Sequence, residues 1–284
     1  MNKPLIIKTY DHNVVFDNID ILFNVCNLWT RTNTERPLDY DAKIALCNTC
    51  NWIDKFHETY HKITLDEYDI HWMKEAMQIG FHTKKFSHIY DDDLQITCKK
   101  YNLLPSIDNA GWFIRTDKVS LKNSCYGIGP YYDMQHVIKS MVSTNSKHVC
   151  FYDNDTSCNI YCIPWKHIDI SKEFRVFVYE NAITAISVQD IYNASQWLID
   201  MTHDRLENII MSIISYFEQN IRDKLEYINT YTYDFAFTED NDPYFIEPNS
   251  FGANYAAGSS LFHWTNDHDK LHDSNSIEFR YVNI

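Results

Sequence analysis

The alternation of apolar and polar residues near the C-terminal end of the chain predicts a β-hairpin. Tyr231–Thr238 and Pro243–Pro248 have the alternating pattern of two short strands. Between them lies an acidic segment centred on Asp240 and Asn241, residue types that favour tight turns. The two strands are therefore expected to pair antiparallel across this turn.

Polar side chains interrupt the apolar strands of this hairpin at facing positions. With Asp240 and Asn241 at the centre of the turn, Asp234 falls opposite Glu247, and Asn249 points to the same side. Like charges opposite each other destabilise a sheet unless a positive group lies between them, and a hard divalent cation bound by oxygens meets this need. We therefore predict a metal site here, with an exposed acidic hairpin as the alternative. The other, apolar face is expected to hold Phe235, Phe237 and Ile246.

Helical periodicity is clear in three segments. The first is expected to begin near Thr64, where Thr64 and Glu67 fit a capping box, and to end at Gly80. The others are Asp133–Met141 and Asp204–Asn220, and the continuous apolar stripe of the latter marks a core face. Residues 13–30 and 38–57 have a helical or mixed pattern.

The strand patterns predict the fold class. Strands are expected at Gly111–Thr116, Asn159–Pro164, Glu173–Tyr179 and Ala182–Ser187. From residue 159 on, strands are followed by a long helix and then by the acidic hairpin. This order predicts an α+β fold in which an antiparallel sheet is backed by a helix.

Composition narrows the class of protein. The chain has 284 residues and a net charge of −14, which argues against a broad nucleic-acid footprint. No apolar stretch approaches the roughly 18 to 20 residues that span a bilayer, and the first apolar run is too short for a signal peptide. We therefore expect a cytoplasmic protein, in the host cytoplasm if its source is viral, that binds neither membrane nor nucleic acid.

Cations on the early strands are candidates for anion contacts. Arg175 lies between Phe174 and Val176 in a strand so apolar that its charge must find an anion, either a neighbouring carboxylate or a ligand. Arg115 and Lys122 lie on and after the Gly111–Thr116 strand, where they could hold phosphate oxygens. A solvated loop is the alternative for the lysines of that segment.

Trp165 completes a possible nucleotide site. It ends a strand shortly before Glu173, where an aromatic ring can serve as a platform for adenine, although a core tryptophan is the simpler interpretation. No phosphate-binding P-loop and no glycine-rich dinucleotide fingerprint is present. Together, the cations, the aromatic ring and the acidic hairpin have the layout of an ATP–magnesium site built on β-structure.

Three motifs at these residues resemble the cell-division-cycle protein 123 family, a branch of the ATP-grasp fold. EFRVFVYENAITAIS, at residues 173–187, is similar to the family's EFR…ISQRD segment, and DFAFTEDNDPYFIEPN is similar to its metal hairpin. SSLFHW, Ser259–Trp264, resembles the Leu-Phe-x-Trp motif that follows, and SLKN, Ser120–Asn123, resembles a Ser-Pro-Lys-Asp loop. The resemblance covers roughly residues 105–265.

The resemblance implies an ATP-grasp-like fold with a nucleotide between two lobes. Residues 1–104 and 105–164 would form the first lobe, mostly helical at its start, and residues 165–284 the second. Asp234, Glu247 and Asn249 would bind Mg²⁺. Arg175, Arg115 and Lys122 would face the ATP phosphates, and Trp165 the adenine. The family is an ATP-dependent assembly factor for eukaryotic translation initiation factor 2 and acts on its gamma subunit.

The chain also departs from the family pattern. Val188 and Gln189 replace Gln-Arg before Asp190, so one arginine that contacts phosphate is missing, and Glu247 replaces an aspartate. Two alternatives to an assembly factor therefore stay open. One is an ATP-grasp ligase that activates a carboxylate as an acyl phosphate, and the other is a binding module that has lost its nucleotide.

Overall fold

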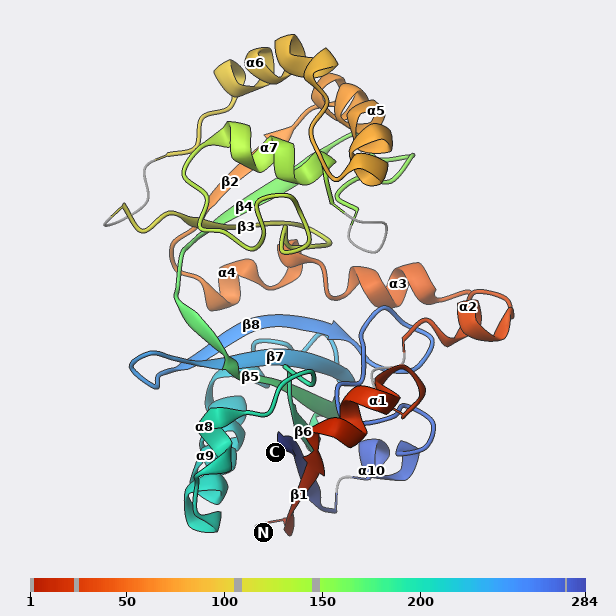
Figure 1. Ribbon diagram of the computed structural model, residues 1–284, viewed down its shortest axis with the longest axis vertical. Helices are drawn as coiled ribbons and strands as arrows, with labels where there is room; N and C mark the ends of the chain where they lie inside the picture. Colours follow the sequence, from red (N-terminus) through yellow and green to blue (C-terminus); the bar gives the residue numbers. More distant parts are fainter. Residues whose placement is uncertain (1–2, 23–25, 105–108, 145–148, 274) are drawn as a thin grey trace. The chain divides into compact units, whose positions relative to one another are not determined.

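The computed structural model describes residues 3–22, 26–104, 109–144, 149–273 and 275–284. The chain forms two compact units (Figure 1). Unit 1 combines Met1–Cys47 with His167–Ile284, and unit 2 is Asn48–Lys166. The predicted boundary between residues 104 and 105 falls at the edge of a segment outside the described residues.

Unit 1 is built on a six-stranded mixed sheet of order β1-β9-β6-β5-β7-β8. β5 pairs antiparallel with both β6 and β7, and β7 pairs antiparallel with β8, whereas β9 pairs in parallel with β1 and β6. The strands are β1 (Leu5–Asp11), β5 (Ile168–Tyr179), β6 (Ala182–Val188), β7 (Tyr231–Thr238), β8 (Pro243–Ser250) and β9 (Ile277–Asn283). The predicted hairpins β5–β6 and β7–β8 are both present.

One face of this sheet is aromatic and is covered by the predicted long helix. Tyr216 and Phe217 of the helix contact the rings of Phe235 and Tyr233, with centroids 5.5 Å and 6.0 Å apart. The continuous helix predicted from the apolar stripe changes to a π-helical turn at its end. The elements on this side are α8 (Gln196–Ile199), α9 (His203–Tyr216) and the π-helix η4 (Phe217–Ile221).

The opposite face of the sheet carries a smaller core and the polar side chains of interest. Phe177 of β5 packs edge-on against Phe262 and Trp264, which come from the loop after β8. Leu271 of α10 completes this core. The remaining helices of unit 1 are α1 (His12–Leu22), α2 (Leu28–Thr32), α3 (Tyr40–Ala45) and α10 (His268–His272).

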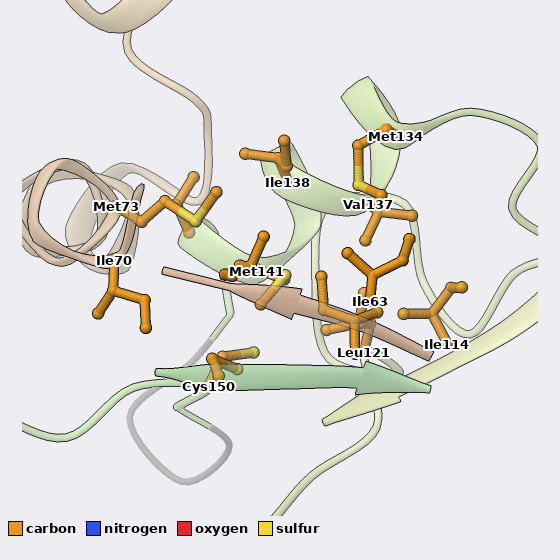
Figure 2. Close-up of a cluster of buried hydrophobic side chains, with 14 of the residues drawn as sticks. Ile63, Ile70, Met73, Ile114, Leu121, Met134, Val137, Ile138, Met141 and Cys150 are labelled. Carbon is orange, nitrogen blue, oxygen red and sulfur yellow. The ribbon is translucent and has the colours of Figure 1, made fainter. Parts of the chain in front are cut away.

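Unit 2 is a three-stranded antiparallel sheet of order β2-β4-β3 with helices packed on it. Figure 2 shows Ile63, Ile114, Met73 and Val137, from the sheet and the helices, pointing into a common apolar core. The elements are η1 (Thr49–Asn51), α4 (Ile53–Phe56), β2 (His61–Leu65), α5 (Glu67–Thr83), η2 (His88–Tyr90), α6 (Asp91–Lys100), β3 (Trp112–Thr116), α7 (Met134–Val142) and β4 (Cys158–Pro164).

The predicted ends of the first helix are wrong. Thr64 lies in strand β2, and the helix is capped instead by Asp66, whose carboxylate accepts a hydrogen bond of 3.1 Å from the Asp69 amide. Gly80 lies inside α5, where an added Cβ would overlap the carbonyl oxygen of Val142. The glycine therefore permits close packing of α5 on α7 and does not end the helix.

The expected α+β class is confirmed by the two sheets and their helices. The grouping of the first 47 residues differs from the expected lobes, because β1 pairs in parallel with β9 from Leu5 opposite Ile277 onward. Within the described part of the chain, no helix has both the length and the apolar character needed to cross a bilayer.

Candidate functional site

The β7–β8 hairpin brings the two predicted carboxylates together. Asp234 pairs directly with Glu247, as predicted from the turn. The pairing nearer the turn is different, because Phe235 faces Phe245 and the Thr238 amide donates to the Asp242 carbonyl at 3.0 Å. A bulge between Asp234 and Phe235 absorbs this difference of one residue and restores the expected pairing beyond it.

The bulge also decides which residues share a face. Ile246 is the extra residue and is only half-buried, whereas Phe245 is buried at the position expected for Ile246 on the apolar face. That part of the prediction is therefore wrong. Asn249 does share a face with Asp234, because its Nδ2 lies 3.3 Å from Oδ2 of Asp234 as a hydrogen-bond donor.

Arg175 provides a positive partner for Asp234. Its Nε and Nη2 donate to the two carboxylate oxygens of Asp234 at 2.9 Å each, and its Nη1 donates to the carbonyl of Gly258 at 2.7 Å. Burial would lower the pKa of Arg175, but the charge and hydrogen bonds of Asp234 outweigh it and raise that pKa. Of the two interpretations of Arg175, the structure shows the pair with a neighbouring carboxylate.

The oxygen atoms of Asp234, Glu247 and Asn249 fit a hard divalent cation. They are too few to fill its coordination shell, so other oxygens would have to supply the remaining ligands. Two carboxylates and an amide offer the oxygen ligands that Mg²⁺ prefers. Oδ1 of Asp234 keeps a second lone pair beside its arginine contact, whereas Oδ2 accepts from both Arg175 and Asn249. Thr232, opposite Asn249 in the ladder, has a buried hydroxyl without a hydrogen-bond partner in the described structure. No group of three or more His, Cys, Asp or Glu side chains gathers for a metal among the described residues.

Arg115 and Lys122 belong to unit 2, whereas the hairpin belongs to unit 1. Arg115 is 2% exposed, its Nε donates to the Thr49 hydroxyl at 2.8 Å, and its guanidinium lies 4.7 Å from the centroid of the Trp52 ring. Lys122 is exposed, and the neighbouring Lys118 pairs with Asp155 at 2.8 Å. Arg115 thus has structural contacts of its own, and Lys122 is open to solvent.

Trp165 also belongs to unit 2 and is held there by backbone contacts. Its amide donates to the carbonyl of Gly111 at 3.1 Å. Its ring lies so close to Gly129 that an added Cβ there would come within 3.0 Å of the indole Cζ3. The ring is half-buried, so it packs on the glycine without entering the apolar core.

Sequence reasoning missed the buried network around Arg280. This residue of β9 is 2% exposed and donates to both oxygens of Asp267 at 2.7 Å, to the Leu261 carbonyl at 2.9 Å and to Glu278 at 2.6 Å. The signal was available, because Arg280 interrupts an apolar strand between Phe279 and Tyr281 as Arg175 does in β5. The network holds the loop that carries the Leu-Phe-x-Trp motif.

Comparisons with known proteins agree with this architecture. A family model described as D123 matches residues 131–284, just over half of the chain, and includes Trp165, Arg175, Asp234, Glu247 and Asn249. Arg115 and Lys122 lie before the matched region. A comparison with curated proteins finds no match.

Among solved structures, the chain is similar to Cdc123 from Schizosaccharomyces pombe. The two chains share 14% identity, with a TM-score of 0.52 over 88% of this chain and 100% of that one. A C-terminally truncated form of the same protein gives a TM-score of 0.55 at the same identity and coverage. A D-alanine–D-alanine ligase from Coxiella burnetii matches more weakly, with 11% identity and a TM-score of 0.35 over 93% of this chain and 62% of the ligase. At these identities the Cdc123 structures establish the shared fold.

Proposed function

The chain belongs to the D123 family, and from this membership we propose that it binds ATP with Mg²⁺ and acts as an ATP-dependent assembly factor. Its protein partner in this proposal is the gamma subunit of translation initiation factor 2, and its place of action is the cytoplasm. The observation that carries the proposal is the convergence of Asp234, Glu247 and Asn249 on one face of the β7–β8 hairpin.

The proposed roles follow from the chemistry of each side chain. The two carboxylates and the Asn249 amide hold the metal, which bridges the phosphates and supplies the charge neutralisation that phosphate binding needs. Arg115 and Lys122 contribute positive charge to the phosphates, Arg115 with a planar guanidinium and Lys122 with a mobile ammonium. Trp165 offers an aromatic surface to the adenine. Arg175 is also proposed to face the phosphates, from a guanidinium whose Nε and Nη2 already donate to Asp234.

A second candidate is a binding module that has lost nucleotide binding. Gln189 stands where the family has an arginine that contacts phosphate, and the Gln189 amide oxygen instead accepts a hydrogen bond from Ser260 at 3.1 Å. This contact anchors the loop after β8, so Gln189 has a structural role that does not need a phosphate. Calorimetric titration of ATP separates this candidate from the first, because only the first binds the nucleotide.

Calorimetric titration of ATP, with and without Mg²⁺, tests the proposal. Wild type is expected to bind ATP in a Mg²⁺-dependent way, and Glu247→Gln is expected to weaken binding at least about tenfold because the metal loses a charged ligand. Glu180→Gln, an exposed glutamate in the β5–β6 turn, is the matched control and should bind as wild type. Absence of ATP binding by wild type would favour the second candidate.

Assembly is tested separately by capture of the purified gamma subunit. We expect capture by wild type to depend on ATP and Mg²⁺ and to be lost in Glu247→Gln, while Glu180→Gln retains it. Normal capture by a Glu247→Gln protein that no longer binds ATP would show that partner binding does not need the nucleotide, and the assembly role would then be wrong in its ATP dependence.

A further inference from the structure

A cavity of about 360 Å³ opens on the aromatic face of the unit 1 sheet, beside α8 and α9. Trp197 of α8 and Phe237 of β7 line it, with ring centroids 5.7 Å apart. Met201 and Ile209 add further apolar surface. Because side chains alternate along β7, Phe237 lies on the face of the sheet opposite to Asp234. The cavity is therefore separate from the candidate metal site.

The lining of this cavity carries positive charge. Arg205 of α9 is exposed, and its guanidinium has no hydrogen bond or ion pair within the described part of the chain. The Nζ of Lys172 lies 5.3 Å from the centroid of the Trp197 ring and donates to Oδ1 of Asn241 at 3.0 Å. No Asp or Glu is among the described residues that line the cavity, in a chain with 39 acidic and 25 basic residues. The lining therefore complements an anion.

The stability of its own helix does not explain Arg205. Helix α9 begins at His203, and the Thr202 side chain caps it by accepting from the Arg205 amide, so Arg205 lies in the first helical turn. A positive side chain there opposes the helix dipole, which favours negative charge at the N-terminal end. An arginine side chain offers only donors, in a planar arrangement that matches a carboxylate. A carboxylate from outside the chain is thus the partner that suits Arg205.

The exposed residues of α9 give the cavity an elongated shape. Arg205, Asn208 and Ser212 all line it, at the spacing of one helix face. From Arg205 to Ser212 the helix rises about 10 Å, so the cavity follows α9 for about two turns. Its volume is near the lower end of the roughly 300–1,000 Å³ range of small-ligand cavities. This shape suits an extended peptide that inserts one large side chain.

We propose that this cavity binds an acidic segment of a partner protein and takes up one aromatic side chain of that segment. The aromatic ring packs on Trp197 and Phe237, and the neighbouring carboxylates pair with Arg205 and Lys172. The Met201 side chain is flexible enough to adapt to the inserted ring. This inference goes beyond the proposed function, because it involves neither the nucleotide nor the metal.

Calorimetric titration without nucleotide tests the proposal. The probe is a short peptide of glutamates around a single phenylalanine. Two matched peptides carry alanine in place of the phenylalanine or glutamines in place of the glutamates. Wild type is expected to bind the probe, and each matched peptide should bind at least about fivefold more weakly, because it lacks either the ring or the charges.

Two variants locate the binding of the probe. Arg205→Gln should weaken it at least about fivefold, because the carboxylates lose their bidentate partner. Asn208→Trp fills the cavity from an exposed position of α9 and should abolish binding. Lys43→Gln removes one positive charge from an exposed position of α3 and should bind the probe as wild type does. Thermal unfolding confirms that each variant is folded.

Several results would overturn the inference. These are a wild type that does not bind the probe, a glutamine peptide that binds as tightly as the probe, and binding by Arg205→Gln or Asn208→Trp that equals that of wild type. Tighter binding of 3-phenylpropionate than of the probe, with the same loss in Arg205→Gln, would identify a site for a small aromatic acid and not for a protein segment. Glu247→Gln should bind the probe normally, so failure of the nucleotide site does not affect this test.

Discussion

Two buried arginines of unit 1 are held in the same way but have different charged groups beside their aspartates. Arg175 and Arg280 each donate two hydrogen bonds to an aspartate, Asp234 or Asp267, and one to a backbone carbonyl of the loop after β8. Around Asp267 a further cation is present, because Lys270 also contacts that carboxylate at 2.6 Å. At Asp234 the additional neighbour is a second carboxylate.

The neighbouring charges distinguish the two arginines. In the Arg280 network, Glu278 pairs with both Arg280 and Lys8, the latter at 2.9 Å, so two carboxylates meet three cations. At Asp234 the bidentate pair with Arg175 stands opposite a second carboxylate, Glu247, on the neighbouring strand. Since a buried polar group is stable only when its partners are complete, the Arg280 network is expected to act as a structural anchor of the loop after β8.

The largest expected effect is the loss of the complete network. Arg280→Met removes the guanidinium but leaves Asp267 and Glu278 with fewer partners in a buried setting, and breaking one side of a buried ion pair typically costs about 3–5 kcal/mol. Chemical denaturation should show a reduction of this size in the free energy of unfolding. A cost below about 1 kcal/mol would mean that the network is not a structural anchor.

The sequence indicates that both arginines need an anion, but it places only one of the two aspartates on the face of a strand. Each arginine interrupts an apolar strand, and the requirement for an anion follows from burial alone. Asp234 could be placed because it lies in a strand whose alternation fixes its face. Asp267 lies between strand and helix, where no periodicity fixes a direction, so its pairing with Arg280 could not be predicted from sequence.

The hairpin shows why a correct prediction can rest on an incomplete argument. The turn was expected to centre on Asp240 and Asn241, and a regular ladder from that centre gives the Asp234–Glu247 pair. The actual ladder near the turn is shifted by one residue, and the bulge at Ile246 cancels the shift. Local turn chemistry does not encode a bulge six residues away, so the buried position of Phe245 was missed.

The pairing of strands that lie far apart in the sequence could not be predicted either. β1 and β9 lie at opposite ends of the chain and pair in parallel, with Leu5 opposite Ile277. Local patterns specify strands but do not specify which distant strand is the neighbour. The N-terminal segment was therefore assigned to the first lobe, although the pairing places it in unit 1.

An intermediate effect is expected when the pH is lowered. Burial would raise the pKa of Asp267, but hydrogen bonds from Arg280 and Lys270 outweigh it and hold that pKa well below its usual range. A carboxylate with a lowered pKa stabilises the fold above its ordinary pKa, and this stabilisation is lost as the pH falls toward the lowered value. Asp267→Asn should thus be less stable than wild type at neutral pH.

The difference in the free energy of unfolding between wild type and Asp267→Asn isolates the contribution of Asp267 from that of the other carboxylates. Denaturation curves of wild type and Asp267→Asn should approach each other as the pH falls from about 5 through the ordinary carboxyl pKa toward the lowered value, because only wild type loses the contribution of this group. A difference that stays constant over this range would show that the charge of Asp267 is not what stabilises the loop.

The smallest expected effect on stability comes from the second carboxylate of the candidate site. Glu247→Gln keeps the size of a half-buried side chain, so the free energy of unfolding should change by less than about 1 kcal/mol. Denaturation in chelator measures this directly. A loss as large as that of Arg280→Met would mean that Glu247 is as much a part of the folded framework as Asp267, and the contrast between the two arginines would then fail.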